Sequence, residues 1–199
     1  MSRKLEPGRL IAATHNKGKV SELKDLFVPL GFEVISAREL QLEEPEETEF
    51  TFEGNALIKA RAAAQATGAP ALSDDSGLEV TALGGMPGVH TALWAGEPRD
   101  FYLAMEKVER ELNAIQSNDR SANFVSCLAV AWSDGHEITF RGEVHGTLTW
   151  PPRGEMGFGY DPVFVPTGFK QTFAELEPAQ KHQMSHRAVA FEKLKATLL

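Results

Sequence analysis

Two adjacent aspartates are the clearest chemical feature of the sequence. Asp74 and Asp75 follow the apolar pair Ala71-Leu72 and precede Ser76-Gly77, so we expect them where a strand gives way to a turn. Neighbouring carboxylates at the end of a strand can hold a hard divalent cation or activate a water molecule. Asp and Ser also serve in ordinary turns, where their side chains bond to backbone amides. The dipeptide alone leaves both roles open.

A second feature is a polar turn with two lysines, Thr14-His15-Asn16-Lys17-Gly18-Lys19. It lies between an apolar run and a helical pattern, where the amide groups of a helix N-terminus favour an anion such as a polyphosphate. The turn is not a P-loop, because Ala13 stands at the first glycine position and Val20 replaces the Ser or Thr. An ordinary strand-to-helix turn is the alternative interpretation.

Residues 38–49 form an acidic stretch with six glutamates, namely Glu39, Glu43, Glu44, Glu46, Glu47 and Glu49. Such a run is either a solvated surface or a source of a metal ligand facing the aspartate pair. The Ala-rich stretch at 51–67 that follows is predicted to be a helix. On it Asn55 and Lys59 are four residues apart and share a face.

Two segments near the C-terminus could contact a ligand. Gly157-Phe158-Gly159-Tyr160-Asp161-Pro162 combines small residues that let a ligand approach the backbone with aromatic rings that can stack on a base. A structural turn with a buried Phe is the alternative. Ser185-His186-Arg187 places a capping residue and two cations at a predicted helix start, where cations oppose the helix dipole. An anion or a hydrogen-bonding base would give those cations a use.

These segments must be positioned by an α/β fold. Apolar patterning predicts strands at 9–14, 32–35, 71–72, 78–83, 124–132, 137–148 and 163–165, with a break at 73–77 and a hairpin turn at 133–136. Apolar residues at helical spacing predict helices at 20–30, 51–67, 100–116 and from about 185 to the end.

Composition narrows the class of protein. The 199 residues are 42% apolar and 24% charged, as in globular proteins, and we treat 1–199 as a single domain. A net charge of −8 does not favour binding to the negatively charged backbone of a nucleic acid, so we expect no nucleic-acid partner. The single cysteine, Cys127, excludes an internal disulfide and is expected to be inert core. No apolar run approaches the roughly 20 residues of a membrane span, and no signal peptide is evident, so a cytoplasmic location without membrane contact is expected.

Common catalytic signatures are absent from the sequence. There is no H-E-x-x-H, no C-x-x-C and no G-x-S-x-G. Separate carboxylates could cleave a glycoside, but the lysine-rich turns would then have no role.

Taken in order, the motifs resemble the inosine triphosphate pyrophosphatase family, from residue 10 to the C-terminus. The segments that carry the resemblance are Thr14 to Lys19, Phe52-Glu53-Gly54-Asn55-Ala56 with Lys59-Ala60, Asp74-Asp75-Ser76-Gly77-Leu78, Gly84-Gly85-Met86-Pro87-Gly88, Gly157 to Pro162, and Lys181 with Ser185-His186-Arg187. Chance agreement at six spaced sites is remote.

The resemblance implies a fold, a reaction and an assembly. The fold would be an elongated mixed sheet with flanking helices, forming two lobes around a central active-site cleft, usually in a homodimer. The reaction would be Mg²⁺-dependent hydrolysis of non-canonical purine nucleoside triphosphates (ITP, dITP, XTP) to the monophosphate and pyrophosphate. That reaction keeps such nucleotides out of DNA and RNA.

The resemblance also implies roles for particular residues. Asp75 matches the general base and a metal ligand, and Glu46 is our choice of second metal ligand, with Glu47 as the alternative. The substrate-binding residues would be Thr14, His15, Asn16, Lys17, Gly18, Lys19, Asn55, Lys59, Ser76, Phe158, Gly159, Tyr160, Asp161, Lys181, His186 and Arg187.

Two positions depart from the family pattern. Leu93 stands where the family usually has an arginine, which puts efficiency or assembly in question, and His15 replaces a frequent glycine. The rival functions are a non-catalytic nucleotide-binding protein on the same scaffold and the related septum-formation pyrophosphatases. The latter open with a Ser-x-Ser-Pro-Arg-Arg type of loop that this chain lacks.

Overall fold

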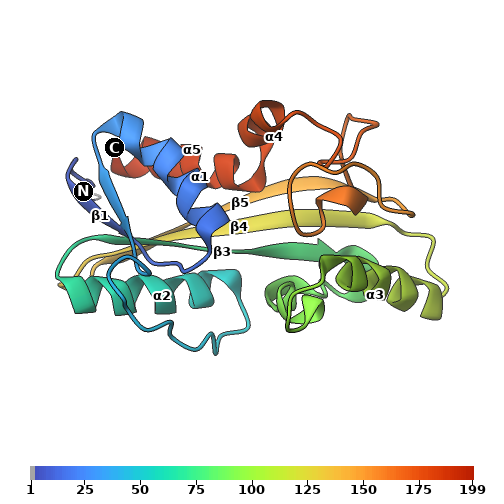
Figure 1. The fold of residues 1–199 in the computed structure, drawn as a ribbon, viewed down its shortest axis with the longest axis horizontal. Helices are drawn as coiled ribbons and strands as arrows, with labels where there is room; N and C mark the ends of the chain where they lie inside the picture. The colour runs from blue at the N-terminus through green and yellow to red at the C-terminus, as the bar shows by residue number, and fades with distance from the viewer. Residues whose placement is uncertain (1–2) are drawn as a thin grey trace. The chain divides into compact units, whose positions relative to one another are not determined.

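The computed structural model describes residues 3–199 (Figure 1). Within them, six strands form one sheet in the order β2-β1-β3-β4-β5-β6. The strands are β1 (Arg9–Ala12), β2 (Glu33–Ser36), β3 (Ala71–Val80), β4 (Ser121–Ala131), β5 (Glu137–Leu148) and β6 (Phe164–Pro166). β1 pairs in parallel with β2 and β3, whereas β5 and β6 are antiparallel. A mixed sheet flanked by helices confirms the expected α/β class.

The chain divides into two compact units. Unit 1 comprises residues up to Asp75 together with Ser126–Gly142 and Ala190–Leu199, and unit 2 comprises Ser76–Val125 and Glu143–Val189. β3, β4 and β5 contribute residues to both units. Asp75 and Ser76, although neighbours in the chain, therefore belong to different units.

The core of unit 1 lies between its strands and three helices. α1 (Lys17–Phe27) and the later part of α5 (His186–Leu198) lie on one face of the sheet, and α2 (Phe52–Thr67) lies on the other (Figure 1). The Phe27 ring meets the rings of Phe32 and Phe191 edge-on, at centroid distances of 5.6 and 5.1 Å. The tight turn between β4 and β5 is closed by the Trp132 N–H, which donates to the His136 carbonyl at 2.9 Å.

α2 packs closely because its buried residues are small. Ala56, Ala60, Ala63 and Ala64 are buried, and the Ser73 hydroxyl of β3 donates to the Ala56 carbonyl at 2.5 Å. Thr51 caps the helix by accepting from the Gly54 N–H at 3.1 Å. A Cβ at Gly54 would lie 2.6 Å from the Glu49 Cβ, so the glycine lets the acidic stretch lie against the first turn of the helix.

The predicted break at residues 73–77 is wrong. β3 runs without interruption from Ala71 to Val80. Turn-forming residues continue the strand here because tertiary partners satisfy their side chains: Ser73 bonds to α2, and Asp74 bonds to groups of α1 and β4. The residues expected to extend the strand, Thr81–Leu83, form a 3₁₀ turn instead.

Unit 2 has its own core around α3 (Phe101–Ala114). Asp100 caps α3 by accepting from the N–H groups of Tyr102 and Leu103 at 2.9 and 3.2 Å. The predicted apolar stripe is buried at Ala104, Met105, Val108 and Leu112. A short helix that the sequence did not suggest, α4 (Pro178–Met184), carries Lys181. The 3₁₀ turns of the described chain are Val28–Leu30, Thr81–Leu83, Gly88–His90, Leu93–Ala95 and Asp161–Val163.

No helix within residues 3–199 has both the length and the apolar character needed to cross a bilayer.

Candidate functional site

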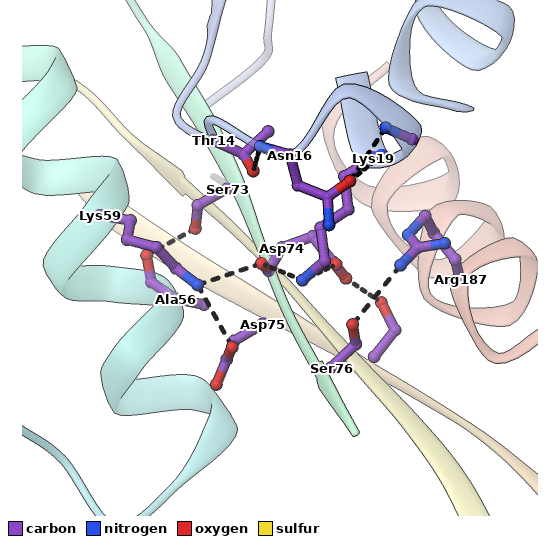
Figure 2. A network of polar contacts seen from close by, with 12 residues as sticks. Thr14, Asn16, Lys19, Ala56, Lys59, Ser73, Asp74, Asp75, Ser76 and Arg187 are labelled. Atoms are coloured by element: carbon purple, nitrogen blue, oxygen red, sulfur yellow. Dashed lines mark hydrogen bonds and ion pairs between the residues drawn. The ribbon is translucent and has the colours of Figure 1, made fainter. Parts of the chain in front are cut away.

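Asp74 is a buried structural carboxylate. Its side chain is fully buried, accepts from the Ser126 hydroxyl at 2.5 Å and pairs with the Lys19 ammonium at 2.8 Å. Side chains of a strand alternate between the two faces of its sheet, so Asp74 points toward α1 and its neighbour points toward α2 (Figure 2).

Asp75 faces α2 and meets a lysine there. Lys59 Nζ lies 3.2 Å from Asp75 Oδ1 and 2.7 Å from the Glu47 carboxylate. The other oxygen, Asp75 Oδ2, is buried and has no hydrogen-bond partner among the described residues. Burial raises the pKa of Asp75 above its ordinary value, and the charges of Lys59 and Lys19 oppose that rise. Burial alone would lower the pKa of Lys59, but the carboxylates of Asp75 and Glu47 outweigh it and raise that pKa.

The two lysines converge on a single acceptor. Lys19 Nζ and Lys59 Nζ both donate to the Asp74 carbonyl oxygen, at 3.1 and 3.2 Å (Figure 2). Both ammonium groups are also paired with carboxylates, Lys19 with Asp74 and Lys59 with Asp75 and Glu47. Each lysine can also donate to a phosphate oxygen, and such charge-assisted hydrogen bonds are strong.

The turn at 14–19 leads into α1 through a side-chain cap. Asn16 Oδ1 accepts from the N–H groups of Gly18 and Lys19 at 2.9 and 3.2 Å, and the Asn16 N–H donates to the Thr14 hydroxyl at 3.2 Å. This cap fixes the start of the helix and hence the direction in which Lys19 leaves it. Lys17 is exposed.

The acidic stretch reaches this group through one glutamate. Both Glu46 and Glu47 are exposed, and Glu47 pairs with Lys59 and is thereby linked to Asp75. Asn55, predicted to contact phosphate, is buried, and its Oδ1 accepts from the Glu49 N–H at 2.9 Å. The structure therefore draws Lys59, Asp75 and Glu47 together and gives Asn55 a contact with the acidic stretch.

Unit 2 gathers a second set of predicted residues. Asp161 Oδ2 accepts from the Phe158 N–H at 2.8 Å and pairs with the buried Lys181 ammonium, which also lies 4.9 Å from the centre of the Phe158 ring. Gly157 is required here, because its φ is +80° and a Cβ would lie 2.1 Å from Asp161 Oδ2. Tyr160 is buried, and its hydroxyl donates to the Thr91 carbonyl at 3.1 Å.

The start of α5 adds two buried side chains, His186 and Arg187, to unit 2. The predicted cap is present, since Ser185 Oγ accepts from the Ala188 N–H at 3.2 Å. The His186 ring stacks on Phe124 at 5.1 Å with 14° between the planes. Arg187 Nη2 lies 3.5 Å from Ser76 Oγ, a contact drawn in Figure 2.

A model described as the Ham1 family matches residues 10–197. The chain belongs to the Ham1 family. This confirms the family expected from the sequence motifs. Among relatives of this Ham1-family chain, a dITP/XTP pyrophosphatase of Caulobacter vibrioides is 58% identical over 190 residues, covering 96% of this chain and 97% of the relative. One of Rhodospirillum centenum is 57% identical over 196 residues, covering 98% and 96%.

Solved structures agree with the Ham1 fold. A HAM1 protein from Coxiella burnetii has a TM-score of 0.89 and 38% identity, covering 94% of this chain and 96% of that one. The Ham1 protein of Staphylococcus aureus has a TM-score of 0.86 at 38% identity, with the same coverage.

Two groups in this Ham1-family chain were not identified from its sequence. Ser126 supports Asp74, and the signal was a hydroxyl inside the apolar run 124–132, because a buried polar group needs a partner. Phe124 supports His186 and gave no signal beyond an aromatic residue in a strand. The interpretation of Cys127 as inert core agrees with the structure: the residue is buried, and burial raises the pKa of its thiol to about 12.

The carboxylates of this Ham1-family chain fit part of a metal site. No three described His, Cys, Asp or Glu side chains are grouped so that they could hold a metal by themselves. Mg²⁺ is usually held by one or two carboxylates, with substrate phosphates and water completing its shell. The unpartnered Oδ2 of Asp75 and the nearby Glu47 carboxylate match that requirement.

Proposed function

We propose that this chain hydrolyses non-canonical purine nucleoside triphosphates, with ITP, dITP and XTP as substrates, to the monophosphate and pyrophosphate. The names of its close relatives support the substrate class. The observation that carries the proposal is local: two lysine ammonium groups meet at the Asp74 carbonyl, beside a buried Asp75 with one unpartnered oxygen.

The chain's own residues supply most of the chemistry. Lys19, Lys59 and the turn at 14–19 bind the triphosphate and stabilise the charge that develops on the departing pyrophosphate. Asp75 accepts the proton of a water molecule that attacks the α-phosphorus. The bond between that phosphorus and the α–β bridging oxygen breaks, and the bridging oxygen leaves with pyrophosphate.

Mg²⁺ belongs to the same proposal. We assign Asp75 and Glu47 as its protein ligands, preferring Glu47 to our initial choice of Glu46 because Glu47 shares Lys59 with Asp75. A bound Mg²⁺ would neutralise negative charge on the phosphate oxygens.

Base recognition is assigned to unit 2. Phe158 is half exposed and offers a face for stacking, while Lys181 and Asp161 hold its segment in place. Hypoxanthine and xanthine present a 6-oxo acceptor where adenine presents a donor. His186 and Arg187 are donors that suit the oxo group. Exclusion of guanine must then act at its 2-amino group.

The assembly and the location complete the proposal. A homodimer is supported by the apolar side chains exposed on unit 2, among them Leu93 and Leu103. A cytoplasmic location without a nucleic-acid partner fits the acidic composition and the nucleotide substrate.

The deciding experiment is a panel of nucleoside triphosphates incubated with Mg²⁺, with products identified by ³¹P NMR. We expect pyrophosphate and the monophosphate from ITP, dITP and XTP, with little reaction of ATP, and no turnover in EDTA. Orthophosphate as the first product, or full activity in EDTA, would contradict the mechanism. Binding of ITP without any product would favour the non-catalytic nucleotide-binding protein.

A further inference from the structure

The His15 side chain is turned toward the acidic loop, which we define as residues 42–49. His15 Nε2 lies 2.9 Å from the Leu42 carbonyl oxygen. Because a carbonyl can only accept, Nε2 carries the proton and donates. The other ring nitrogen, Nδ1, lies 3.7 Å from a carboxylate oxygen of Glu44. With the proton on Nε2, Nδ1 of a neutral ring is an acceptor, so the hydrogen bond to Leu42 is the contact that holds the loop.

The acidic loop spans a pocket at this place. The pocket, of about 310 Å³, lies within unit 1 and has Leu42, Glu43, Glu44 and Pro45 in its lining. The alanines of α2 that share the lining, Ala62, Ala63 and Ala66, are therefore separated from that part of the loop. Where the loop lines this pocket it is not packed directly against α2, so its hydrogen bonds and ion pairs help to determine where it lies.

Point contacts hold the acidic loop at both ends. At its start, the Leu42 N–H donates to the Ala37 carbonyl at 3.0 Å and its carbonyl accepts from His15. At its end, Glu47 pairs with Lys59 at 2.7 Å and the Glu49 N–H donates to Asn55 at 2.9 Å. His15 therefore holds the end of the loop that α2 does not hold.

The turn that carries His15 is held in place by its neighbouring residues. It lies in the turn between β1 and α1, next to Asn16, whose side chain caps α1, and to Thr14, which is buried. The same turn carries Lys19. His15 therefore connects the turn assigned to the triphosphate with the loop that carries Glu47.

We propose that His15 is a positioning residue: by holding the acidic loop at the Leu42 carbonyl, it keeps the Glu47 carboxylate beside Lys59 and Asp75. This role replaces the substrate contact that the sequence suggested for its side chain. The part that concerns metal dependence rests on the proposed function. A glycine at this position would have no side chain to make the contact with Leu42.

The first test needs no substrate. Amide hydrogen exchange of residues 42–49 is compared in metal-free wild type, His15→Ala and His15→Gln, with His145→Ala on β5 as the matched control. We expect His15→Ala to speed exchange at Leu42 and Glu49. His15→Gln keeps a donor for the Leu42 carbonyl and should restore protection. Should His15→Ala yield little folded protein, His15→Asn replaces it, since its side chain is too short to reach Leu42.

The second test uses ITP at a series of Mg²⁺ concentrations. Losing a group that orients a metal ligand typically weakens metal binding at least about 10-fold, so His15→Ala should raise the half-saturating Mg²⁺ about that much. In His15→Gln the half-saturating Mg²⁺ concentration should stay close to that of wild type, because its side chain keeps a donor for the Leu42 carbonyl. Direct titration with Mn²⁺ followed by electron paramagnetic resonance should show the same order of affinities.

The two proposals fail in different ways. If wild type releases no pyrophosphate, the proposed function is wrong, while the exchange experiment still tests His15. If wild type is active and His15→Ala has wild-type exchange and Mg²⁺ dependence, the positioning role is wrong. If His15→Ala has a higher KM for ITP and unchanged amide hydrogen exchange, His15 contacts the substrate instead.

Discussion

At Asp75, burial and neighbouring charge act in opposite directions on one carboxyl group. Burial raises its pKa, and the ammonium groups of Lys59 and Lys19 counter that rise. A general base has to be ionised before it can accept a proton, so the lysines serve the base as well as the substrate. The same two cations, meeting at the Asp74 carbonyl, thus give Asp75 and the phosphates a common support.

Asp75→Asn should lower kcat at least about 10²-fold, the range for loss of a general base. Folding should be nearly unaffected, because Lys59 keeps its pair with Glu47. Steady-state kinetics with ITP and a thermal melt check both points, with the exposed Asp119→Asn as control. Near-wild-type turnover would move the role to Asp74 or to the metal alone.

Arg187→Ala should lower kcat/KM for ITP and reduce the difference in kcat/KM between ITP and ATP. A site built around a required hydrogen bond rejects analogues that lack it, because a buried polar group is left unpaired. Dependence on Mg²⁺ should not change, because Arg187 and Ser76 lie in unit 2 and the proposed metal ligands lie in unit 1. Steady-state kinetics with ITP and with ATP measure the ratio of their kcat/KM values, and Arg110→Ala on α3 is the control. Full discrimination in the Arg187 variant would show that this residue does not read the base.

At the scale of elements, the turn after β2 depends on an ionised side chain. Glu39 Oε2 accepts from the Ser36 N–H and hydroxyl at 2.6 and 2.8 Å. The Ser36 N–H, the Ser36 hydroxyl and Lys24 hold the pKa of Glu39 down at about 2. A carboxyl whose pKa is depressed in the folded state stabilises the fold at neutral pH and loses that effect as the pH falls.

Glu39→Gln should therefore lower the free energy of unfolding at pH 7. The difference from wild type should persist down to pH 4.5, the ordinary pKa, and shrink as the pH falls toward 2. Urea unfolding at pH 7, 5, 4 and 3 measures it, with Glu106→Gln on α3 as control. A difference that is constant across this range would mean that ionisation of Glu39 is not what matters.

Elements with local signals were predictable from the sequence. The capping residues Asp100 and Thr51 mark the starts of α3 and α2. The spacing of apolar residues predicts which face of each helix is buried. α4 was missed because seven residues are too few to show a period. The course of β3 through Asp74 depends on Lys19 and Ser126, which lie far away in sequence.

The site shows the same division. The family resemblance assigned Lys19, Lys59 and Asp75 to one chemistry, and the structure places their charged groups around Asp74 and Asp75. The choice between Glu46 and Glu47 could not come from sequence, because the course of a loop is set by contacts such as the one with Lys59.

At the scale of the whole molecule, charge and exposed apolar surface suggest how copies of the chain behave. A net charge of −8 repels a polyanion from most of the surface, so binding has to rely on the local lysines. Unit 2 exposes Leu93 at 73% and Leu103 at 55%, and Tyr102 lies against Trp150 with 6.3 Å between ring centres. Exposed apolar side chains of this size are candidates for a contact between copies.

We expect a homodimer in solution, and Leu93→Asp should shift it toward monomer because a charge would be buried without a partner. Light scattering coupled to size exclusion over a range of concentrations measures the mass. Phe50→Asp, at an exposed site in unit 1, is the control. A monomeric wild type at every concentration would overturn the homodimer, and a Leu93 variant that stays dimeric would place the interface elsewhere.

Successive side chains of β3 point to opposite faces of the sheet, and this has a consequence for libraries of variants. Asp74 and Asp75 are chemically identical neighbours, yet the first is a fully buried support for Lys19 and Ser126, and the second faces Lys59 with one unpartnered oxygen. In a pooled screen of cellular abundance, substitutions at Asp74 should deplete the protein, because removing one partner of a buried pair commonly costs about 3–5 kcal/mol. Asp75→Asn should leave abundance higher, because Lys59 keeps its pair with Glu47, and should mainly lower turnover. A screen that measures activity alone would not distinguish the two positions.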